Sequence, residues 1–324
     1  MKVHILDDWF DTLRDLPCFE KLAEHDVTVW TDHEPDPNAL AARIADAEAL
    51  VLFRERTKIG AELLGRVPNL RLISQRSVYP HIDVDACTRN DVLLSSNMHS
   101  DTPSYAAAEL TLGLVLGSFR QLQQQAASLK SGNWQFGVGR TLRNRKLGLY
   151  GYGRIARAVA EYAKALGMHV QWWASESGRA KALADGEIVA ASRNAFFATS
   201  DVVSVHVRLK PDTRGIISAG DLAAMQPRSL FVNTSRSGLV ERGALESEVL
   251  KGRIYAAVDV FDHEPLTDTD NVLLTSPNVL ATPHIGYVTE DEFDLQFSDI
   301  FDQINAYAAG APIHMINPEV WTAR

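Results

Sequence analysis

The chain has 324 residues, of which 46% are hydrophobic and 23% charged, and its formal net charge is −9 at pH 7. This length predicts two domains, each large enough to bury its own core. The acidic balance argues against a nucleic-acid-binding protein, and no apolar run approaches the roughly 18 residues of a membrane-spanning helix, so neither nucleic acid nor membrane is an expected partner.

The first hundred residues alternate short apolar runs with helical patterns. The helical patterns are clearest at residues 38–48 and 60–67. The runs of strand length lie at residues 3–6, 27–30, 49–52, 70–73 and 92–94. Strands that alternate with helices predict a parallel sheet with helices on both faces.

The N-terminus and the cysteine count indicate the compartment. Residues 1–8 lack the apolar core of a signal peptide and are typical of a strand instead. Cys18 and Cys87 are the only cysteines, too few for a disulfide framework. We therefore expect a cytoplasmic protein.

A loop at residues 74–81 follows the fourth predicted strand and contains Arg76, Ser77 and Val78. Open parallel sheets bind ligands at the carboxyl ends of their strands, so this loop is a candidate substrate loop. A plain surface loop with one solvated arginine explains the same residues equally well.

A single long helix is expected after residue 101, and it should end at residues 131–132. Either Asp101 or Thr102 could cap its start. Residues 106–116 are apolar nearly all round, which indicates burial of that end. The following arm carries Trp134 and Phe136, which could pack on a partner subunit or cover the chain's own core.

From residue 146 a second alternation begins with a strand, a glycine turn, a helix and another strand. Gly151 permits the tight turn, Gly153 lets a pyrophosphate approach the helix N-terminus, and Ala156 allows the helix to pack closely. In this context a dinucleotide site is the leading interpretation. Further strands of this doubly wound sheet are expected at residues 188–189, 202–207, 230–233, 255–258 and 279–281.

The last helix, expected at residues 289–309, lies beyond the final strand of the second sheet and should therefore cross back to the first domain. The expected fold is α/β with two doubly wound parallel-sheet domains. A Rossmann dinucleotide-binding domain at residues 102–286 would be inserted in a flavodoxin-like substrate-binding domain at residues 1–101 and 287–324. The two crossings, near Asp101 and Pro283, would form a hinge.

Three late segments each place charged groups just after a predicted strand of the second domain. They supply the guanidinium of Arg236, the carboxylate of Glu264 and the imidazole of His284. Arginine can bind the carboxylate of a 2-keto acid and polarise its keto oxygen. Histidine can transfer the hydroxyl proton, and a neighbouring carboxylate favours its protonated form. Adjacent residues rarely converge on one ion, so no metal site is expected at residues 262–264.

Five motifs recur here in order, at residues 151–155, 204–213, 232–238, 259–265 and 282–286. Through them the chain resembles the D-isomer-specific 2-hydroxyacid dehydrogenases, which include phosphoglycerate, glycerate and formate dehydrogenases. The resemblance implies that Arg236 anchors the substrate, that His284 is the acid/base, and that Glu264 is its partner. It also implies a homodimer joined through the second domain.

The same resemblance implies which residues bind each ligand. The residues expected at the cofactor are Gly151, Gly153, Arg154, Ile155, Ala174, Ser175, His206, Thr213, Thr234, Ser235 and Asp259. The residues expected at the substrate are Arg76, Ser77, Val78, Asn97 and Arg236.

Two departures from the family pattern leave alternatives open. Ala174 replaces the acid that grips the adenosine ribose, and Ser175 with Arg179 could receive a 2′-phosphate, which Glu176 would repel. NAD is the expected cofactor, with NADP possible. The substrate loop lacks the usual glycines, and cations at positions 54, 56 and 76 keep a phosphoglycerate-like substrate open.

The predicted function is hydride transfer between NAD(P) and a small D-2-hydroxy acid or its 2-keto acid. The alternative is an NAD(H)-sensing, co-repressor-like binding protein on the same fold. The retained Arg236, Glu264 and His284 favour the enzyme.

Overall fold

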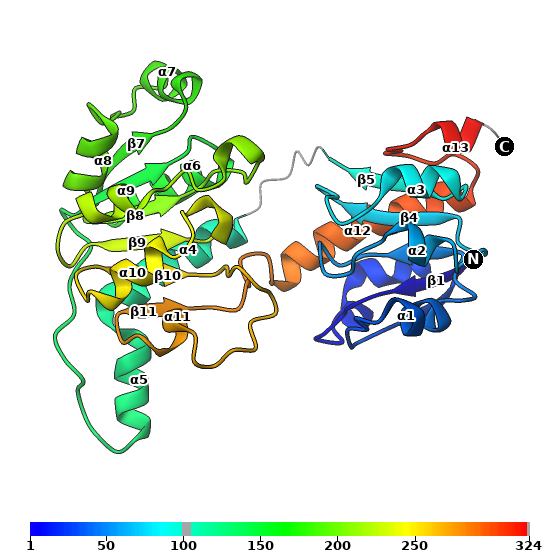
Figure 1. Ribbon diagram of the computed structural model, residues 1–324, viewed down its shortest axis with the longest axis horizontal. Coiled ribbons are helices and arrows are strands. Elements are labelled where there is room, and N and C mark those ends of the chain that lie inside the picture. The colour runs from blue at the N-terminus through cyan, green and yellow to red at the C-terminus, as the bar shows by residue number, and fades with distance from the viewer. Residues whose placement is uncertain (99–104, 323–324) are drawn as a thin grey trace. The chain divides into compact units, whose positions relative to one another are not determined.

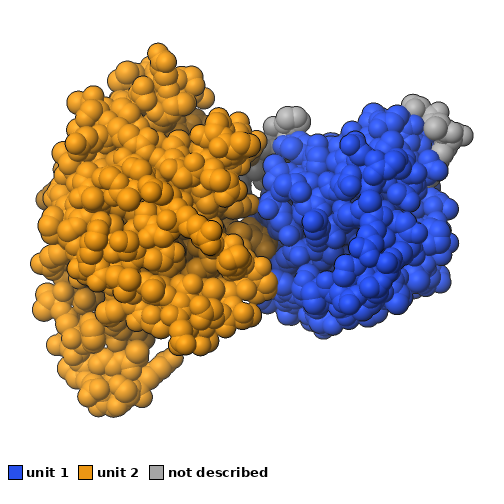
Figure 2. Space-filling model, in the orientation of Figure 1, with its two compact units in different colours: residues 1–102, 289–324 blue, residues 103–288 orange. Residues whose placement is uncertain are grey.

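The computed structural model describes residues 1–98 and 105–322. The chain divides into two compact units (Figure 2). Unit 1 comprises residues 1–102 and 289–324, and unit 2 comprises residues 103–288. Each unit has its own parallel sheet (Figure 1). The expected α/β fold with two parallel-sheet domains is confirmed.

Unit 1 contains a five-stranded sheet in the order β2-β1-β3-β4-β5, with every pair parallel. This is the flavodoxin-like order. Its strands are β1 (Lys2–Ile5), β2 (Asp26–Val29), β3 (Ala49–Val51), β4 (Leu72–Arg76) and β5 (Leu93–Asn97). The other elements of this unit are η1 (Leu13–Asp15), η2 (Pro17–Leu22), α1 (Pro37–Arg43), α2 (Ala61–Leu64), α3 (Val84–Arg89), α12 (Glu290–Ala308) and α13 (Glu319–Thr322).

Helices cover both faces of this sheet because successive strand residues point to opposite sides. Ile73 belongs to the core that β4 shares with α1, α2 and α3. The next residue, Ser74, donates its hydroxyl to the Ile300 carbonyl of α12 at 2.8 Å. Thr289 caps α12 by accepting from the Glu292 amide, and Phe297 and Phe301 of this helix are buried. The helix α12 is the one expected at residues 289–309.

Unit 2 contains a six-stranded parallel sheet in the order β11-β10-β9-β8-β6-β7 (Figure 1). Its strands are β6 (Lys146–Tyr150), β7 (His169–Trp173), β8 (Val202–Val205), β9 (Leu230–Asn233), β10 (Tyr255–Val258) and β11 (Val279–Ala281). Its helices are α4 (Ala106–Arg120), α5 (Leu122–Lys130), α6 (Arg154–Ala165), α7 (Glu176–Ala184), α8 (Arg193–Thr199), η3 (Pro211–Thr213), α9 (Ala219–Ala224), η4 (Ser237–Leu239), α10 (Ala244–Leu250) and α11 (Val272–Thr275).

The strand expected at residues 188–189 is wrong as a strand. Only a single parallel bridge forms there, between Trp172 of β7 and Val189. The side chain of Ile188 is 68% exposed, and its carbonyl accepts from the Trp172 amide at 2.8 Å. With that bridge counted as the outermost position, the strand order matches the Rossmann pattern.

The single long helix expected after residue 101 is also wrong, because the helix breaks at Gln121. This residue has φ +53°, in the left-handed region, and separates α4 from α5. Leu114 and Phe119 of α4 are buried, whereas none of the α5 residues is. The break thus falls where the apolar pattern ends. The caps expected at Asp101 and Thr102, and the hinge expected there, lie outside the described residues.

The arm after α5 is exposed in this chain. Trp134 is 77% exposed and Phe136 is 55% exposed. The main-chain amide of Phe136 donates to Gln125 Oε1 at 2.9 Å, which ties the arm to α5. The expectation that these rings cover the chain's own core is therefore wrong, and packing on a partner subunit stays a prediction.

Both cysteines are unpaired and buried, and burial is the main cause that raises the pKa of each thiol to about 12. Across residues 1–98 and 105–322, no helix is long and apolar enough to cross a membrane. Over the same residues, no three His, Cys, Asp or Glu side chains are grouped so that they could hold a metal ion.

Candidate active site

The glycine turn after β6 is shaped by the neighbouring strand ends. Gly151 has φ +112°, and a Cβ built on it would lie 2.3 Å from the carbonyl oxygen of His206, just after β8. Its amide donates to the carbonyl of Trp173 at the end of β7, at 2.7 Å. Only glycine combines this φ with so close a neighbour.

The second glycine of the motif faces open space at the start of α6. A Cβ built on Gly153 would meet no atom within 4 Å, and Gly153 is the N-cap of this helix. Arg154 and Ile155 begin α6, whose first turn contains no acidic residue, and Ala156 is fully buried. Helix N-termini attract anions, so these residues fit the pyrophosphate of a dinucleotide.

The two glycines should respond differently to the same substitution. Gly151→Ala is expected to lower the melting temperature clearly, because the methyl group would collide with the His206 backbone. Gly153 has φ −103° and free space around it, so the Gly153→Ala variant should keep the fold. Its methyl group would occupy the space proposed for the pyrophosphate, so dinucleotide binding should weaken by about tenfold or more. Thermal unfolding and nucleotide titration of both variants test this, and equal melting temperatures would contradict it.

His206 and Thr213 lie on the loop after β8. His206 Nε2 lies 2.8 Å from the Ser204 hydroxyl, and burial lowers the pKa of His206 to about 4, so its ring is neutral at physiological pH. The Thr213 hydroxyl accepts from the Lys210 amide and donates to the Arg208 carbonyl, each at 2.7 Å. Both residues thus order this loop beside Gly151.

The turn after β9 is held by side-chain bonds to the backbone. Asn233 Nδ2 donates to the Arg236 carbonyl at 2.9 Å, and Asn233 Oδ1 accepts from the Ser235 amide at 3.0 Å. The Ser235 hydroxyl donates to the Val205 carbonyl, and the Thr234 hydroxyl lies 2.8 Å from that of Thr111 in α4. These bonds fix where the Arg236 side chain leaves the backbone.

The structure brings Glu264 and His284 together. His284 Nδ1 lies 2.5 Å from Glu264 Oε2, and the other carboxylate oxygen accepts from the Phe261 amide at 2.8 Å. Burial alone would raise the pKa of Glu264, but these two hydrogen bonds, with the charges of His284 and Arg236, outweigh it and lower that pKa. Glu264 is therefore an ionised partner that orients His284 through Nδ1.

Asp259 holds the loop that carries His284. It is fully buried and accepts from the Thr282 hydroxyl at 2.6 Å and from the amides of Ile285 and Gly286 at 2.9 Å each. Burial outweighs these bonds and raises its pKa. His284 itself has φ +54°, in the left-handed region that few non-glycine residues adopt. A contact of Asp259 with the cofactor stays a prediction.

In unit 1, Arg76 ends β4 and is only 8% exposed, so the alternative of a solvated surface arginine is wrong. Its Nε lies 3.1 Å from Asp299 Oδ2 of α12, and the same oxygen accepts from Asn97 Nδ2 at 3.0 Å. Its NH1 is buried without a hydrogen-bond partner among the described residues. Sequence reasoning missed Asp299, which lies 202 positions after Asn97.

Ser77 and Val78 continue from Arg76 into the loop. Ser77 has φ +77°, and its amide donates to the Asn97 carbonyl at 3.1 Å. Its own carbonyl accepts from the Ser96 hydroxyl at 2.7 Å. The expected substrate loop is thus tied to β5, although it lacks glycine at the left-handed position.

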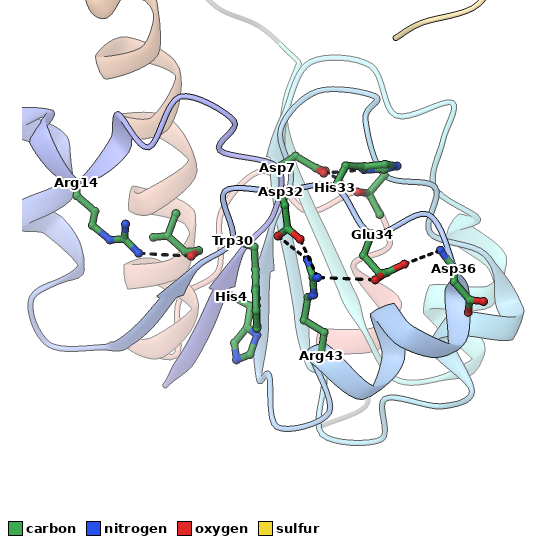
Figure 3. Close-up of polar contacts among 11 residues, drawn as sticks. His4, Asp7, Arg14, Trp30, Asp32, His33, Glu34, Asp36 and Arg43 are labelled. Carbon is green, nitrogen blue, oxygen red and sulfur yellow. Dashed lines mark hydrogen bonds and ion pairs between the residues drawn. The ribbon is translucent and has the colours of Figure 1, made fainter. Parts of the chain in front are cut away.

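A second polar cluster lies at the ends of β1 and β3. Buried Asp7 accepts from Thr57, and its other carboxylate oxygen lies 2.8 Å from His33 Nδ1 (Figure 3). Arg56 donates to the Asp7 carbonyl at 2.6 Å and lies over the ring of Trp9, 3.8 Å from its centroid. Arg56 is therefore fixed in place near the strand ends.

The chain matches known proteins over most of its length. Residues 112–286 match the model of the D-isomer specific 2-hydroxyacid dehydrogenase NAD binding domain. D-3-phosphoglycerate dehydrogenase of Methanocaldococcus jannaschii is 34% identical over 91% of this chain and 55% of its own length. Hydroxypyruvate reductase of Thermotoga maritima is 34% identical over 83% of this chain and 87% of its own.

A solved structure, that of a phosphoglycerate oxidoreductase from Vibrio cholerae, agrees in fold. It is 43% identical to this chain and has a TM-score of 0.90, and the match covers 96% of this chain and 100% of the solved chain. The chain spans little more than half the length of the D-3-phosphoglycerate dehydrogenases of Methanocaldococcus jannaschii and Mycobacterium leprae. This chain belongs to the D-isomer specific 2-hydroxyacid dehydrogenase family, with its NAD binding domain in unit 2.

Proposed function

We propose that the protein is an NAD(P)-dependent dehydrogenase that interconverts a small D-2-hydroxy acid and its 2-keto acid. The observation that carries this proposal is the 2.5 Å pair of Glu264 and His284, with the charge of Arg236 acting on the same carboxylate. These residues follow β9, β10 and β11, at the carboxyl edge of the sheet that also bears Gly151. An ionised acid, a histidine and an arginine at this edge suit 2-keto acid reduction.

In the reductive direction, Arg236 binds the substrate carboxylate and orients the keto carbon. The bound dinucleotide supplies the hydride. His284 shares Nδ1 with Glu264, so Nε2 is the nitrogen that gives a proton to the keto oxygen. Glu264, whose pKa is lowered, is ionised and orients the imidazole through Nδ1 before the transfer. In the oxidative direction, the neutral imidazole takes the proton back.

We further propose that residues 102–286 are the dinucleotide-binding domain and that residues 1–101 and 287–324 are the substrate-binding domain. The cofactor residues proposed above all lie in unit 2. Arg76, Ser77, Val78 and Asn97 are the proposed substrate residues of unit 1. The exposed Trp134 and Phe136 support a homodimer joined through unit 2, and two unpaired cysteines suit the cytoplasm.

Arg76 supports a substrate with a second anionic group. Arg76 ends β4, and its guanidinium can bind a carboxylate or phosphate group through parallel hydrogen bonds. A phosphorylated or dicarboxylic 2-keto acid has such a second group, whereas glyoxylate does not. Asp299 compensates part of the arginine's charge and holds its Nε.

A panel of 2-keto acids, each assayed with NADH and NADPH, tests the function and the substrate class. We expect the best turnover with phosphohydroxypyruvate or a dicarboxylic keto acid. Arg76→Met should lower kcat/KM for that substrate by about tenfold or more, while glyoxylate reduction changes little. The control is Arg71→Met, at the opposite end of β4 and exposed. Equal losses of kcat/KM on all substrates in Arg76→Met would contradict the proposed substrate class. Nucleotide binding by the parent protein without any turnover would favour the alternative of an NAD(H)-sensing binding protein.

A further inference from the structure

We infer that the end of β7 recognises the 2′-phosphate of NADP(H), so that unit 2 binds NADPH more tightly than NADH. The inference deepens the proposed dinucleotide site and rests on it. In dinucleotide-binding folds, the residues after the second strand meet the adenosine ribose, where an acid selects NAD and a cation accommodates the 2′-phosphate. Here those residues are Ala174 to Arg179.

Ala174 stands at the position where an acid usually binds the adenosine ribose, and the first turn of α7 packs on it. Ala174 is only 8% exposed. A Cβ built on Gly178 would lie 2.8 Å from Ala174 Cβ, so the first turn of α7 packs directly on residue 174. Ala174 has no carboxylate to accept hydrogen bonds from the ribose hydroxyls or to repel a 2′-phosphate. The feature that favours NAD in this fold is therefore missing.

A cation is held at the same place. The guanidinium of Arg179 lies over the ring of Trp173, the last residue of β7, 4.5 Å from its centroid. Arg179 NH1 donates to the Ala174 carbonyl at 2.6 Å. The stacked ring and the carbonyl position the guanidinium before any ligand binds, which reduces the ordering cost of binding. Arginine suits phosphate because its planar donors bind two oxygens together.

Two hydroxyl groups lie beside this arginine. Ser175 caps α7 by accepting from the Gly178 amide, and its hydroxyl is 3.2 Å from that of Ser177. Both serines are exposed and can donate to phosphate oxygens. The N-terminal end of this nine-residue helix also favours negative charge.

Glu176 opposes the phosphate. It is the acidic residue of the first turn of α7 and is exposed. Exposed charges are screened by solvent and salt, whereas Arg179 is half-buried and fixed. We therefore expect Glu176 to reduce the preference for NADPH without reversing it.

Nucleotide binding to the protein without substrate tests the inference independently of turnover. NADPH and NADH are titrated by fluorescence, and 2′,5′-ADP and 5′-AMP by calorimetry. We expect NADPH to bind about tenfold more tightly than NADH, and 2′,5′-ADP about tenfold more tightly than 5′-AMP. Arg179→Met should remove this difference and leave NADH affinity unchanged. Glu176→Gln should increase the NADPH affinity a few-fold.

The control is Lys181→Met, which removes an exposed cation two residues along α7 and should change neither affinity. If Arg179→Met unfolds, the Glu176→Gln variant still tests the inference, because this substitution leaves the contacts of Arg179 intact. Equal or tighter binding of NADH by the parent protein would overturn the inference. So would equal losses of both nucleotides in a folded Arg179→Met variant. Failure of the keto-acid panel alone would leave it standing.

Discussion

Replacing His284 by asparagine is expected to lower kcat for keto-acid reduction by about 10³-fold, within the range that general acid–base catalysis contributes. Asparagine is the sharpest choice because its Nδ2 can keep the hydrogen bond to Glu264 that Nδ1 of the histidine makes. Asparagine also tolerates φ +54° better than most residues. The variant should therefore fold and bind dinucleotide normally while it lacks the proton donor.

The pH dependence gives a second measurement of the same group. Reduction takes up one proton, which the proposed mechanism routes through His284, so the rate of the wild type should fall as the pH rises. Glu264, whose pKa is lowered, stays ionised into the acid range. Its contribution to stability is present above the ordinary carboxyl pKa and is lost only as the pH falls through the lowered value.

The matched control for this prediction is His263→Asn. His263 is exposed and immediately precedes Glu264 in the same loop. Its substitution should leave kcat and the pH profile unchanged. Near-normal turnover of His284→Asn on a substrate that the wild type reduces well would rule out His284 as the acid, as would a rate that does not change between neutral and alkaline pH.

Replacing Arg236 by lysine is expected to lower kcat/KM by about 10²-fold or more although the charge is kept. A guanidinium holds a carboxylate through two parallel hydrogen bonds, which an ammonium group cannot reproduce. Arg236 also donates from NH1 to the Ser235 carbonyl at 2.7 Å, which sets the direction of its planar group. Lysine lacks that fixed geometry, so both the affinity for the keto acid and its orientation should suffer.

Dinucleotide binding distinguishes this loss from general damage to unit 2. The affinity for NADH or NADPH and the melting temperature of Arg236→Lys should match those of the wild type, because Asn233 and Ser235 still hold the turn. Arg242→Lys, at an exposed arginine six positions further along the chain, should be silent in every assay. If Arg236→Lys kept the parent kcat/KM on the whole panel, substrate anchoring by Arg236 would be refuted.

The parts of this protein that were predictable from the sequence depend on neighbours in the chain. The apolar runs and the glycine turn are local patterns, and the strand-end segments that carry Arg236, Glu264 and His284 follow such runs directly. Parallel strands place their carboxyl ends at one edge of a sheet. The α/β fold with two parallel sheets could therefore be predicted from the sequence alone, and so could the strand-end placement of these three residues.

Packing between distant segments decided the rest. The break at Gln121 follows from which half of the helix finds a core to cover, and a periodic pattern does not locate the left-handed residue. Asp299 reaches Arg76 and Asn97 only because α12 lies on β4 and β5.

The glycine turn at residues 151–153 shows both kinds of determination in one place. Its sequence predicts a tight bend, since glycine alone adopts φ +112° without strain. That His206 presses on Gly151 while Gly153 stays open depends on β6, β7 and β8 lying side by side. Likewise, the first turn of α7 packs on Ala174 and brings Arg179 onto Trp173. Conformational preferences act within a few residues, whereas the position of a side chain against its partner depends on how the strands are ordered and how the helices pack on them.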